Sequence, residues 1–311
     1  MQKPSSGLWP GVARQNGGAV IVGNLTGQPR VTSASPDQTR WQAQLELWFE
    51  NRADKTCLVR RRHVGPLAVQ RPFYPERDGT THVYLLHPPG GVVGGDQLEI
   101  SCHLSQNARA LLTTPGAAKF YRSPLRTCDM RTNIDVAAGA ICEYFPQETI
   151  LFDGCNASIE TLIDLAPDAV YMGWDVTSFG RPAADERFTS GAVRQCTKIL
   201  RAGRPIWFER LHIESGSTLI DSKFGLAEKP ILGTMIYAGP MVEDLAERIR
   251  AVVNATADHG VFSVSQLEQT LVCRYLGASA AEAKSLFARA WDVLRRVALG
   301  KPAVTPRIWS T

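Results

Sequence analysis

The stretch "WQAQLELWFE", residues 41–50, alternates apolar with mostly polar side chains at a period of two. Successive side chains of a β-strand point to opposite faces of a sheet, whereas a helix repeats about every 3.6 residues. The pattern therefore predicts a half-buried strand. Its apolar set consists of Trp41, Ala43, Leu45, Leu47 and Phe49.

The same rhythm continues to about Gly239. "MRTNIDV" (130–136) alternates in the same way, and runs such as "HVYLLH", "AICEYF", "ASIETLIDL" and "PIWFERLHI" are bounded by Gly, Pro, Asn or Asp. Short strands separated by turn residues are typical of all-β proteins, and no sustained helical pattern interrupts them. The sequence predicts a mainly β fold of stacked or sandwiched sheets and disfavours a doubly wound α/β fold.

Beyond Pro240 the apolar period changes to that of a helix. In "MVEDLAERIRAVVNAT" (241–256) the apolar residues fall on one helical stripe. Two capping boxes, each followed by a glycine, predict two further helices. They are Ser265 with Glu268, closed by Gly277, and Ser279 with Glu282, closed by Gly300. The chain after about residue 240 is therefore predicted to be a small, all-helical part whose apolar faces pack on the sheet, on one another or on a partner, with burial within the chain as the default expectation.

The first 38 residues are rich in Gly, Ser, Pro, Gln, Asn and Thr, unlike the rest of the chain. Such a segment has little apolar surface to bury, so residues 1–38 are predicted to be a flexible leader. Residues 39–311 are predicted to form a single β-rich domain, although a chain of 311 residues also leaves room for two modest ones.

Composition indicates an ordinary globular protein. Seven cysteines, widely spaced and without a C-x-x-C pair, indicate neither a disulfide framework nor a structural zinc site. The sequence shows neither a signal peptide nor an apolar run long enough to cross a membrane. The 34 basic and 30 acidic residues are spread along the chain, which argues against nucleic acid as a partner. We therefore expect a cytoplasmic protein that binds neither nucleic acid nor a membrane.

The loop "HPPGGVVGGD" (87–96) concentrates prolines and glycines between two apolar strands. It is not a phosphate-binding loop, because Asp96 stands where a P-loop needs a lysine, nor a dinucleotide fingerprint, because Val92 replaces its second glycine. Prolines preset φ and glycines allow φ above zero, so we predict a double bend that Asp96 caps. The glycines would let a neighbouring strand, a partner or a water path approach this bend closely. The loop residues are His87, Pro88, Pro89, Gly90, Gly91, Gly94, Gly95 and Asp96.

Four blocks in a fixed order carry a family resemblance: "HPPGGVVGGD" (87–96), "LLTTPGAAKFYRS" (111–123), "YFPQETILFDGCNA" (144–157) and "GWDVTSFGRPAADERF" (173–188). Together they resemble the urease accessory protein UreD, called UreH in some organisms. The general layout fits from about residue 41 to the C-terminus. The chain departs from the family pattern at Ala118, where threonine is common, at Cys155, where a small residue is usual, and at Asp185, where glycine is usual.

The resemblance implies a protein without catalysis of its own. UreD-like proteins act as scaffolds in the activation of urease: they bind the accessory protein UreF, through it the GTPase UreG, and dock on the urease apoprotein subunits while nickel is delivered. The family's fold is mainly β, with stacked sheets and a small helical part. The resemblance also implies no tightly bound cofactor, a transient contact with nickel(II), and an internal water-filled route for the metal.

Carboxylates within these blocks are candidates for lining such a route. Oxygen ligands hold nickel(II) more loosely than imidazole or thiolate, and a conduit must release its ion as well as admit it. A buried carboxylate is unfavourable unless it is paired or hydrated, so each candidate has a salt bridge as its alternative role. The candidates are Glu143, Glu148, Asp153, Asp175 and Glu186, and the alternative partners are Arg122, Arg126, Arg181 and Arg187.

Other residues of the blocks have less specific assignments. His87 is a candidate for a transient metal contact, with a turn hydrogen bond as its alternative role. Lys119, Tyr121 and Arg122 are expected at a sheet edge, where they meet either acids of the chain or a partner.

Two other functions are alternatives to the nickel-route scaffold. A purely structural scaffold without a metal role is the alternative function. A hydrolase is not indicated, because the G-x-S-x-G motif is absent and nothing fixes the separation of a carboxylate pair.

Overall fold

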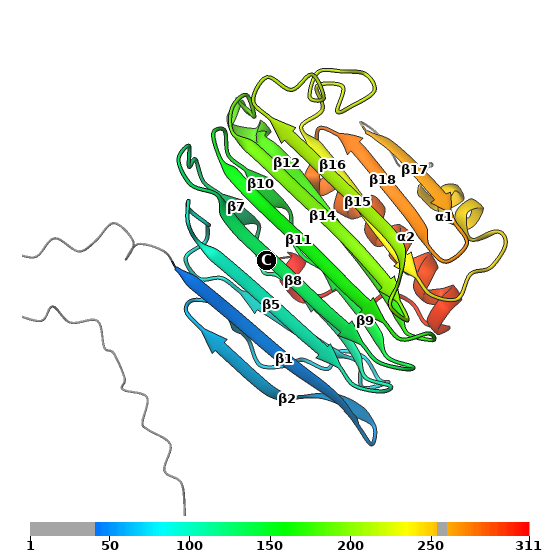
Figure 1. Ribbon diagram of the computed structural model, residues 1–311. Coiled ribbons are helices and arrows are strands. Elements are labelled where there is room, and N and C mark those ends of the chain that lie inside the picture. Colours follow the sequence, from blue (N-terminus) through cyan, green and yellow to red (C-terminus); the bar gives the residue numbers. More distant parts are fainter. Residues whose placement is uncertain (1–40, 254–259, 311) are drawn as a thin grey trace, which may run out of the picture. The chain divides into compact units, whose positions relative to one another are not determined.

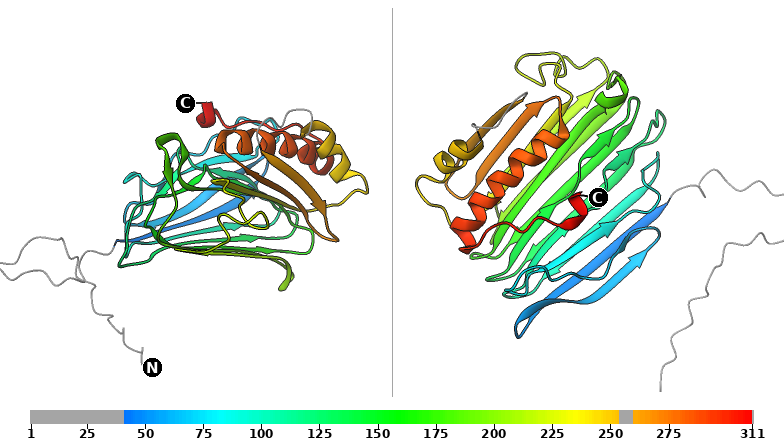
Figure 2. Two further views of the ribbon diagram at one scale, coloured as in Figure 1. Left: turned by 90° about the horizontal axis from the view of Figure 1, so that it is seen from above. Right: turned by 180° about the vertical axis from the view of Figure 1, so that it is seen from behind.

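The computed structural model describes residues 41–253 and 260–310. These residues form three layers: a seven-stranded sheet, a larger sheet stacked against it, and helices on the far side of the larger sheet (Figures 1 and 2). The predicted mainly β fold with stacked sheets is confirmed. The predicted leader, residues 1–38, lies outside the described residues.

The first sheet has five parallel strands at its centre and an antiparallel strand at each edge. In spatial order its strands are β15 (Arg204–Glu214), β14 (Ala192–Arg201), β11 (Asn156–Leu165), β8 (Cys128–Val136), β5 (Gln97–Leu104), β1 (Gln42–Arg52) and β2 (Lys55–Val64). Because its outer face carries no covering layer, this sheet alternates buried and exposed residues along most strands (Figure 2).

The second sheet combines parallel strands with an antiparallel extension. In spatial order it contains β17 (Val261–Gln266), β18 (Leu271–Gly277), β16 (Ile231–Ala238), β12 (Val170–Arg181), β9 (Ile141–Phe145), β6 (Arg109–Thr113), β4 (Thr81–Leu86) and β3 (Ala68–Val69). Strands β4, β6, β9 and β12 are parallel, and β16, β18 and β17 continue the sheet antiparallel. Three short strands lie off this path: β7 (Ala118–Phe120), β10 (Thr149–Leu151) and β13 (Glu186–Arg187).

The chain winds between the sheets through three similar turns, from β5 to β6, from β8 to β9 and from β11 to β12. Each turn ends in a buried alanine whose N–H donates to the carbonyl three residues earlier, at 3.0 to 3.1 Å; the alanines are Ala108, Ala140 and Ala169. Successive turns stack, since Ile141 N–H donates to Ala108 O and Val170 N–H to Ala140 O. Parallel neighbours usually need a helical crossover, and here a strand of the opposite sheet takes its place.

Alternate residues of the strands fill the space between the sheets, as the period of two predicts. In β1, Ala43, Leu45, Leu47 and Phe49 are each at most 1% exposed, which confirms the predicted buried face. The prediction is wrong for Trp41, which is 54% exposed because it precedes the first residue of the strand.

The central strands of the second sheet are buried on both faces. All residues of β9 are buried, which matches the continuous apolar run expected of a parallel strand covered on both sides. Its far face packs against α1 (Leu245–Val253) and α2 (Ala280–Leu299). Trp291 of α2 meets Phe145 of β9 edge to face, with ring centroids 4.9 Å apart.

The helical part is only partly as predicted. Helix α2 has the predicted caps, because the Ser279 hydroxyl accepts from Glu282 N–H at 3.2 Å and Gly300 ends the helix at a φ of 65°. Helix α1 lies within the predicted segment, and two short 3-10 helices are η2 (Pro182–Ala184) and η3 (Arg307–Ser310).

The helix predicted from Ser265 to Gly277 is wrong, because this segment forms parts of β17 and β18. The segment "VFSVSQLEQTLVCRYLG" (261–277) is rich in β-branched residues, and the strand β16 pairs with β18 along its length. The open hydrogen-bonding edge of β16 therefore outweighs the local capping signal. Glu268 lies in the hairpin turn, which Leu267 N–H and Thr270 O close at 2.7 Å.

The loop of residues 87–96 makes the predicted double bend. Gly90 N–H donates to His87 O and Asp96 N–H to Val93 O, each at 3.0 Å, and the Asp96 carboxylate caps the second bend by accepting from Val93 N–H. A side chain at Gly91 would place Cβ 2.1 Å from the Tyr121 ring, so glycine permits the close approach of the neighbouring segment.

Candidate functional site

A cavity of about 100 Å³ lies between the two sheets. It is bounded by strands of the first sheet from β5 to β15 and by β9, β12 and β16 of the second. A water molecule needs roughly 10–15 Å³ by the same measure, so the cavity has room for several waters.

Polar side chains of the first sheet line the cavity as one row. Thr132, Thr161 and Thr197 are paired in register on neighbouring parallel strands, and Glu209 of β15 continues the row. Equal positions on in-register strands face the same way, so one recurring threonine per strand builds a ladder of hydroxyl groups. The apolar members of the same row, Leu45 and Ile100, lie toward the other edge of the sheet.

Asp175 of β12 faces this ladder from the second sheet. Its carboxylate accepts a hydrogen bond from Gln195 Nε2. It accepts a second hydrogen bond, at 3.1 Å, from the Thr177 hydroxyl. The accessible surface of Asp175 faces the cavity, and burial raises the pKa of its carboxyl to about 6, with the nearby Glu209 charge adding to the effect. The site therefore holds a carboxylate whose charge is poorly solvated and open to compensation by a cation.

Asp175→Asn is expected to stabilise the protein at pH 8 relative to wild type by about 1–3 kcal/mol, and to lose this advantage near pH 4. A carboxyl whose pKa rises on folding, here from 3.8 to about 6, penalises the folded state increasingly as the pH rises between these two values and fully above the higher one, and the amide removes the charge. Urea unfolding of both proteins at pH 4, 6 and 8 measures the difference. An advantage independent of pH would contradict this assignment.

One end of the cavity is closed by an ion pair. Arg274 of β18 donates to Glu209 at 2.5 Å and to the Thr234 hydroxyl at 3.2 Å. Arg274 is 41% and Glu209 24% exposed, so the pair stands between the cavity and solvent. Thr234 is in register with both Asp175 and Arg274, which places the three side chains in one row of the second sheet.

The opposite end lies where the second sheet is interrupted. Thr114, Pro146 and Gln147, which follow β6 and β9, line the cavity there. Gln147 N–H donates to the Thr114 hydroxyl at 2.9 Å. Glu148, the next residue, pairs with Lys284 of α2.

The structure does not gather the five predicted carboxylates into one site. Asp175 lines the cavity, and Glu148 adjoins its interrupted end. Glu143 faces the opposite side of the second sheet, where it is fully buried against Arg295 and Trp291.

The remaining two predicted carboxylates, Asp153 and Glu186, form hydrogen bonds that hold loop segments in place. Asp153 accepts from the N–H groups of Thr189 and Ser190 at 2.7 and 2.8 Å, and these bonds lower its pKa although burial raises it. Glu186 pairs with Arg181, one of the predicted alternative partners, and also accepts from Asp153 N–H at 3.0 Å. Both carboxylates are thus committed to fixed hydrogen bonds.

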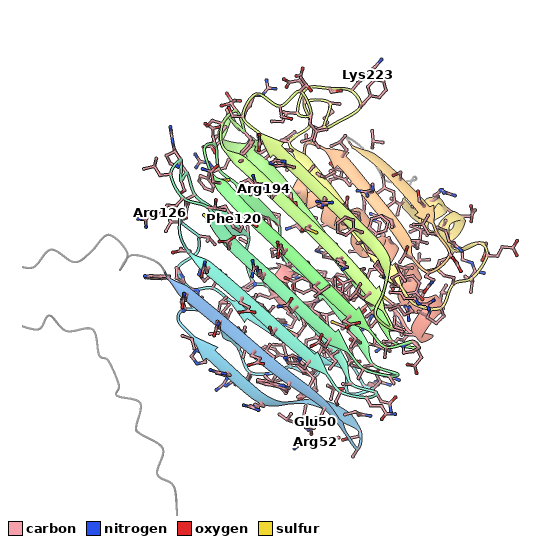
Figure 3. The ribbon with its side chains drawn as sticks, in the orientation of Figure 1. Glu50, Arg52, Phe120, Arg126, Arg194 and Lys223 are labelled. Carbon is pink, nitrogen blue, oxygen red and sulfur yellow. The ribbon has the colours of Figure 1, made fainter. Side chains whose placement is uncertain are left out.

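The remaining block residues lie around β7. Within the described chain, neither Lys119 nor Arg122 forms an ion pair, and Tyr121 meets Phe152 edge to face at 4.9 Å. Figure 3 labels Phe120, which lies within this segment, and Arg126, which follows it. Strand β7 pairs with β10 on one side, and on its other side it forms a single bridge with Val92. This agrees with the predicted position at a sheet edge. His87 is half-buried, and burial lowers its pKa.

Sequence reasoning missed most of the cavity lining. The threonine row, Gln195, Glu209 and Arg274 carry no recognisable motif. Their common signal is a polar residue at an inward position of a strand, such as Thr161 in "TLIDL" (161–165). This signal becomes informative only once the parallel register of the strands is known.

The described residues contain no group of three or more histidine, cysteine, aspartate or glutamate side chains arranged to hold a metal ion. No helix within residues 41–253 and 260–310 is long and apolar enough to cross a membrane.

Comparison with known proteins identifies the relatives of this chain. A family model described as UreD urease accessory protein matches residues 42–310. The urease accessory protein UreD 2 of Brucella anthropi is 57% identical over 88% of this chain and 99% of its own length. The urease accessory proteins UreD of Methylobacillus flagellatus and Trichormus variabilis are 44% and 39% identical, over 90% and 87% of this chain and 98% and 96% of their own lengths.

Proposed function

The chain belongs to the UreD family of urease accessory proteins, and from this premise we propose that it acts in urease maturation as a non-catalytic scaffold that assists nickel insertion. The proposed partners are the urease apoprotein subunits, UreF, and UreG through UreF. The family match over nearly the whole β-rich part carries this proposal.

The cavity supports a further element of the proposal, a hydrated route for nickel(II) between the sheets. Its lining offers hydroxyl, amide and carboxylate oxygens, which bind nickel(II) loosely enough to release it. A cation also compensates the poorly solvated charge of Asp175. Both properties suit transit better than storage.

The proposed path runs from the Glu209–Arg274 ion pair, past Asp175, to Gln147 and Glu148. It uses two of the five carboxylates predicted from the sequence. Glu143, Asp153 and Glu186 have structural roles in this proposal, because each is already engaged by arginine or by backbone N–H groups.

Asp175→Asn is expected to lower the nickel content per urease active site severalfold, while the chain still co-purifies with its partners. The amide keeps the shape of the side chain but removes the charge that a passing cation meets within the cavity. The measurement is nickel per active site by mass spectrometry after co-expression with the urease subunits and the other accessory proteins. Asp164→Asn is the matched control, because Asp164 is exposed at an outward position of β11.

A purely structural scaffold is the second candidate, favoured by the engagement of Glu143, Asp153 and Glu186 in fixed contacts. It predicts that Asp175→Asn leaves nickel loading equal to that of Asp164→Asn. Reduced loading with intact complexes would rule this candidate out, and reduced loading with lost complexes would contradict the expectation that the variant acts on the metal and not on partner binding.

A further inference from the structure

The hydrogen-bonded ladder of the second sheet has a gap. Pairing of β6 with β9 ends at Thr113 and Phe145 and resumes, as β7 with β10, at Ala118 and Thr149. Strand β12 pairs with β9 up to Gly173 and with β10 from Thr177. We call the gap the sheet window, defined by residues 114–117, 146–148 and 174–176.

Prolines in the sequence create the window. "TTPGA" (113–117) and "FPQE" (145–148) each place a proline just after a strand, where its missing N–H ends the ladder. The freed groups find other partners: Trp174 Nε1 donates to Pro146 O at 2.8 Å, and Ala118 N–H donates to Glu148 O at 3.0 Å. The gap in the ladder is therefore a stable feature of the sheet.

The cavity reaches the window from one side, and Lys284 reaches it from the other. Gln147 lines the cavity, and its Oε1 accepts from Lys284 Nζ at 2.5 Å. The same ammonium donates to Glu148 Oε2 at 2.5 Å. Lys284 and Glu148 are only 24% and 23% exposed, so the contact is shielded by protein.

On the basis of the proposed nickel route, we propose that Lys284 is a tethered cationic plug that decides whether a divalent cation passes the sheet window. Its ammonium occupies the position where an ion leaving the cavity first meets a carboxylate. While it is there, it neutralises Glu148 and repels a divalent ion. When it swings away, Glu148 and Gln147 present two oxygen ligands to the cation.

The chemistry of lysine suits this role. Its ammonium is a compact charge on a flexible four-carbon stem and makes no fixed bidentate fork, unlike arginine. Lys284 also lies in the first turns of α2, so a partner that shifts this end of the helix would move the plug without breaking either sheet. Nickel release thereby becomes dependent on a partner bound at the helical layer.

The test compares Ni²⁺ binding by the full chain and its variants in equilibrium dialysis. Lys284→Met is expected to bind Ni²⁺ at least about tenfold more tightly than wild type, because a charge that repels the ion within a few ångströms is removed. The double variant Lys284→Met with Glu148→Gln is expected to lose this gain. Lys284→Arg is expected to bind Ni²⁺ no more tightly than wild type, since it keeps the charge, and Lys198→Met is expected to match wild type, since it removes a lysine from the outer face of the first sheet.

The proposal is overturned if Lys284→Met binds Ni²⁺ no better than wild type, or if the gain survives in the double variant. Lys284→Gln, which keeps a hydrogen-bonding group but no charge, replaces Lys284→Met if the latter does not fold. Nickel content of co-expressed urease separates this inference from the proposed route. If Lys284→Met gains Ni²⁺ affinity but urease loading does not change, the proposed route is contradicted, while the effect of Lys284 on cation binding at the sheet window is supported. If Lys284→Met gains no Ni²⁺ affinity, the role proposed for Lys284 is contradicted whatever the loading.

Discussion

Replacing Arg295 with methionine is expected to lower the free energy of unfolding by about 3–5 kcal/mol, because it leaves the buried Glu143 without its cation and takes one of two cations from Glu76, which keeps Lys301. The Arg295 side chain is fully buried between α2 and the second sheet. Its guanidinium contacts Glu143 at 2.6 Å and Glu76 at 2.7 Å, and both carboxylates are at most 3% exposed.

All five N–H groups of the Arg295 guanidinium are engaged. Nε and Nη2 donate to Glu143, Nη1 and Nη2 donate to Glu76, and Nη1 also donates to Pro302 O. Methionine fills much of the volume but satisfies none of these acceptors. The arginine therefore joins the sheet, helix α2 and the C-terminal segment at one point.

Arg296→Met is the matched control, since the neighbouring arginine is exposed and pairs with Asp292 one turn earlier in the helix. Such a surface pair contributes about 0–1 kcal/mol. Urea unfolding of the three proteins at pH 7 provides the measurement. Equal losses for Arg295→Met and Arg296→Met would show that the buried network does not hold the helix on the sheet.

The loss caused by Arg295→Met should also depend on pH. Burial alone raises the pKa of Glu76, but hydrogen bonds from His82 and Arg295 lower it to about 2. A depressed carboxyl pKa stabilises the fold above the unfolded value of 4.5 and ceases to do so as the pH falls through the folded value. The difference between wild type and Arg295→Met should therefore narrow between about pH 4.5 and pH 2, as the carboxylates become protonated.

The strands were predictable from the sequence because a half-buried strand repeats every two residues, as β1 and β8 do. The parallel winding was not, since a strand with one buried face alternates in the same way whichever direction its neighbour runs. The turns hold a signal that was overlooked. "LSQNA" (104–108), "VAAGA" (136–140) and "LAPDA" (165–169) share an apolar first residue and a final alanine, and these turns stack in the structure.

Strand parity explains which candidate carboxylates reach the cavity. Tyr144 lines the cavity, so its neighbour Glu143 must face the helical layer. In β12, Gly173 and Asp175 line the cavity, and Val176 packs on the helical side. The sequence located the right strands, but the face of each residue depends on which side the helices cover, and that is decided by packing between distant segments.

Leaving this chain out of urease maturation is expected to reduce both the nickel content and the urea hydrolysis of the enzyme to near background. The scaffold proposed here holds apo-urease and the other accessory proteins together, so its loss should leave the nickel-binding site of urease unfilled. The experiment co-expresses the urease subunits and the remaining accessory proteins with and without the chain, and it measures nickel per active site together with activity.

The omission experiment also ranks the structural proposals. If nickel and activity require the chain, the Asp175→Asn and Lys284→Met variants then decide whether metal passes through the cavity or the chain merely aligns its partners. Restoration by Arg296→Met but not by Arg295→Met would tie function to the docking of α2 on the second sheet. If nickel loading is unchanged without the chain, its membership of the UreD family describes its fold and ancestry, and the cavity requires a different explanation.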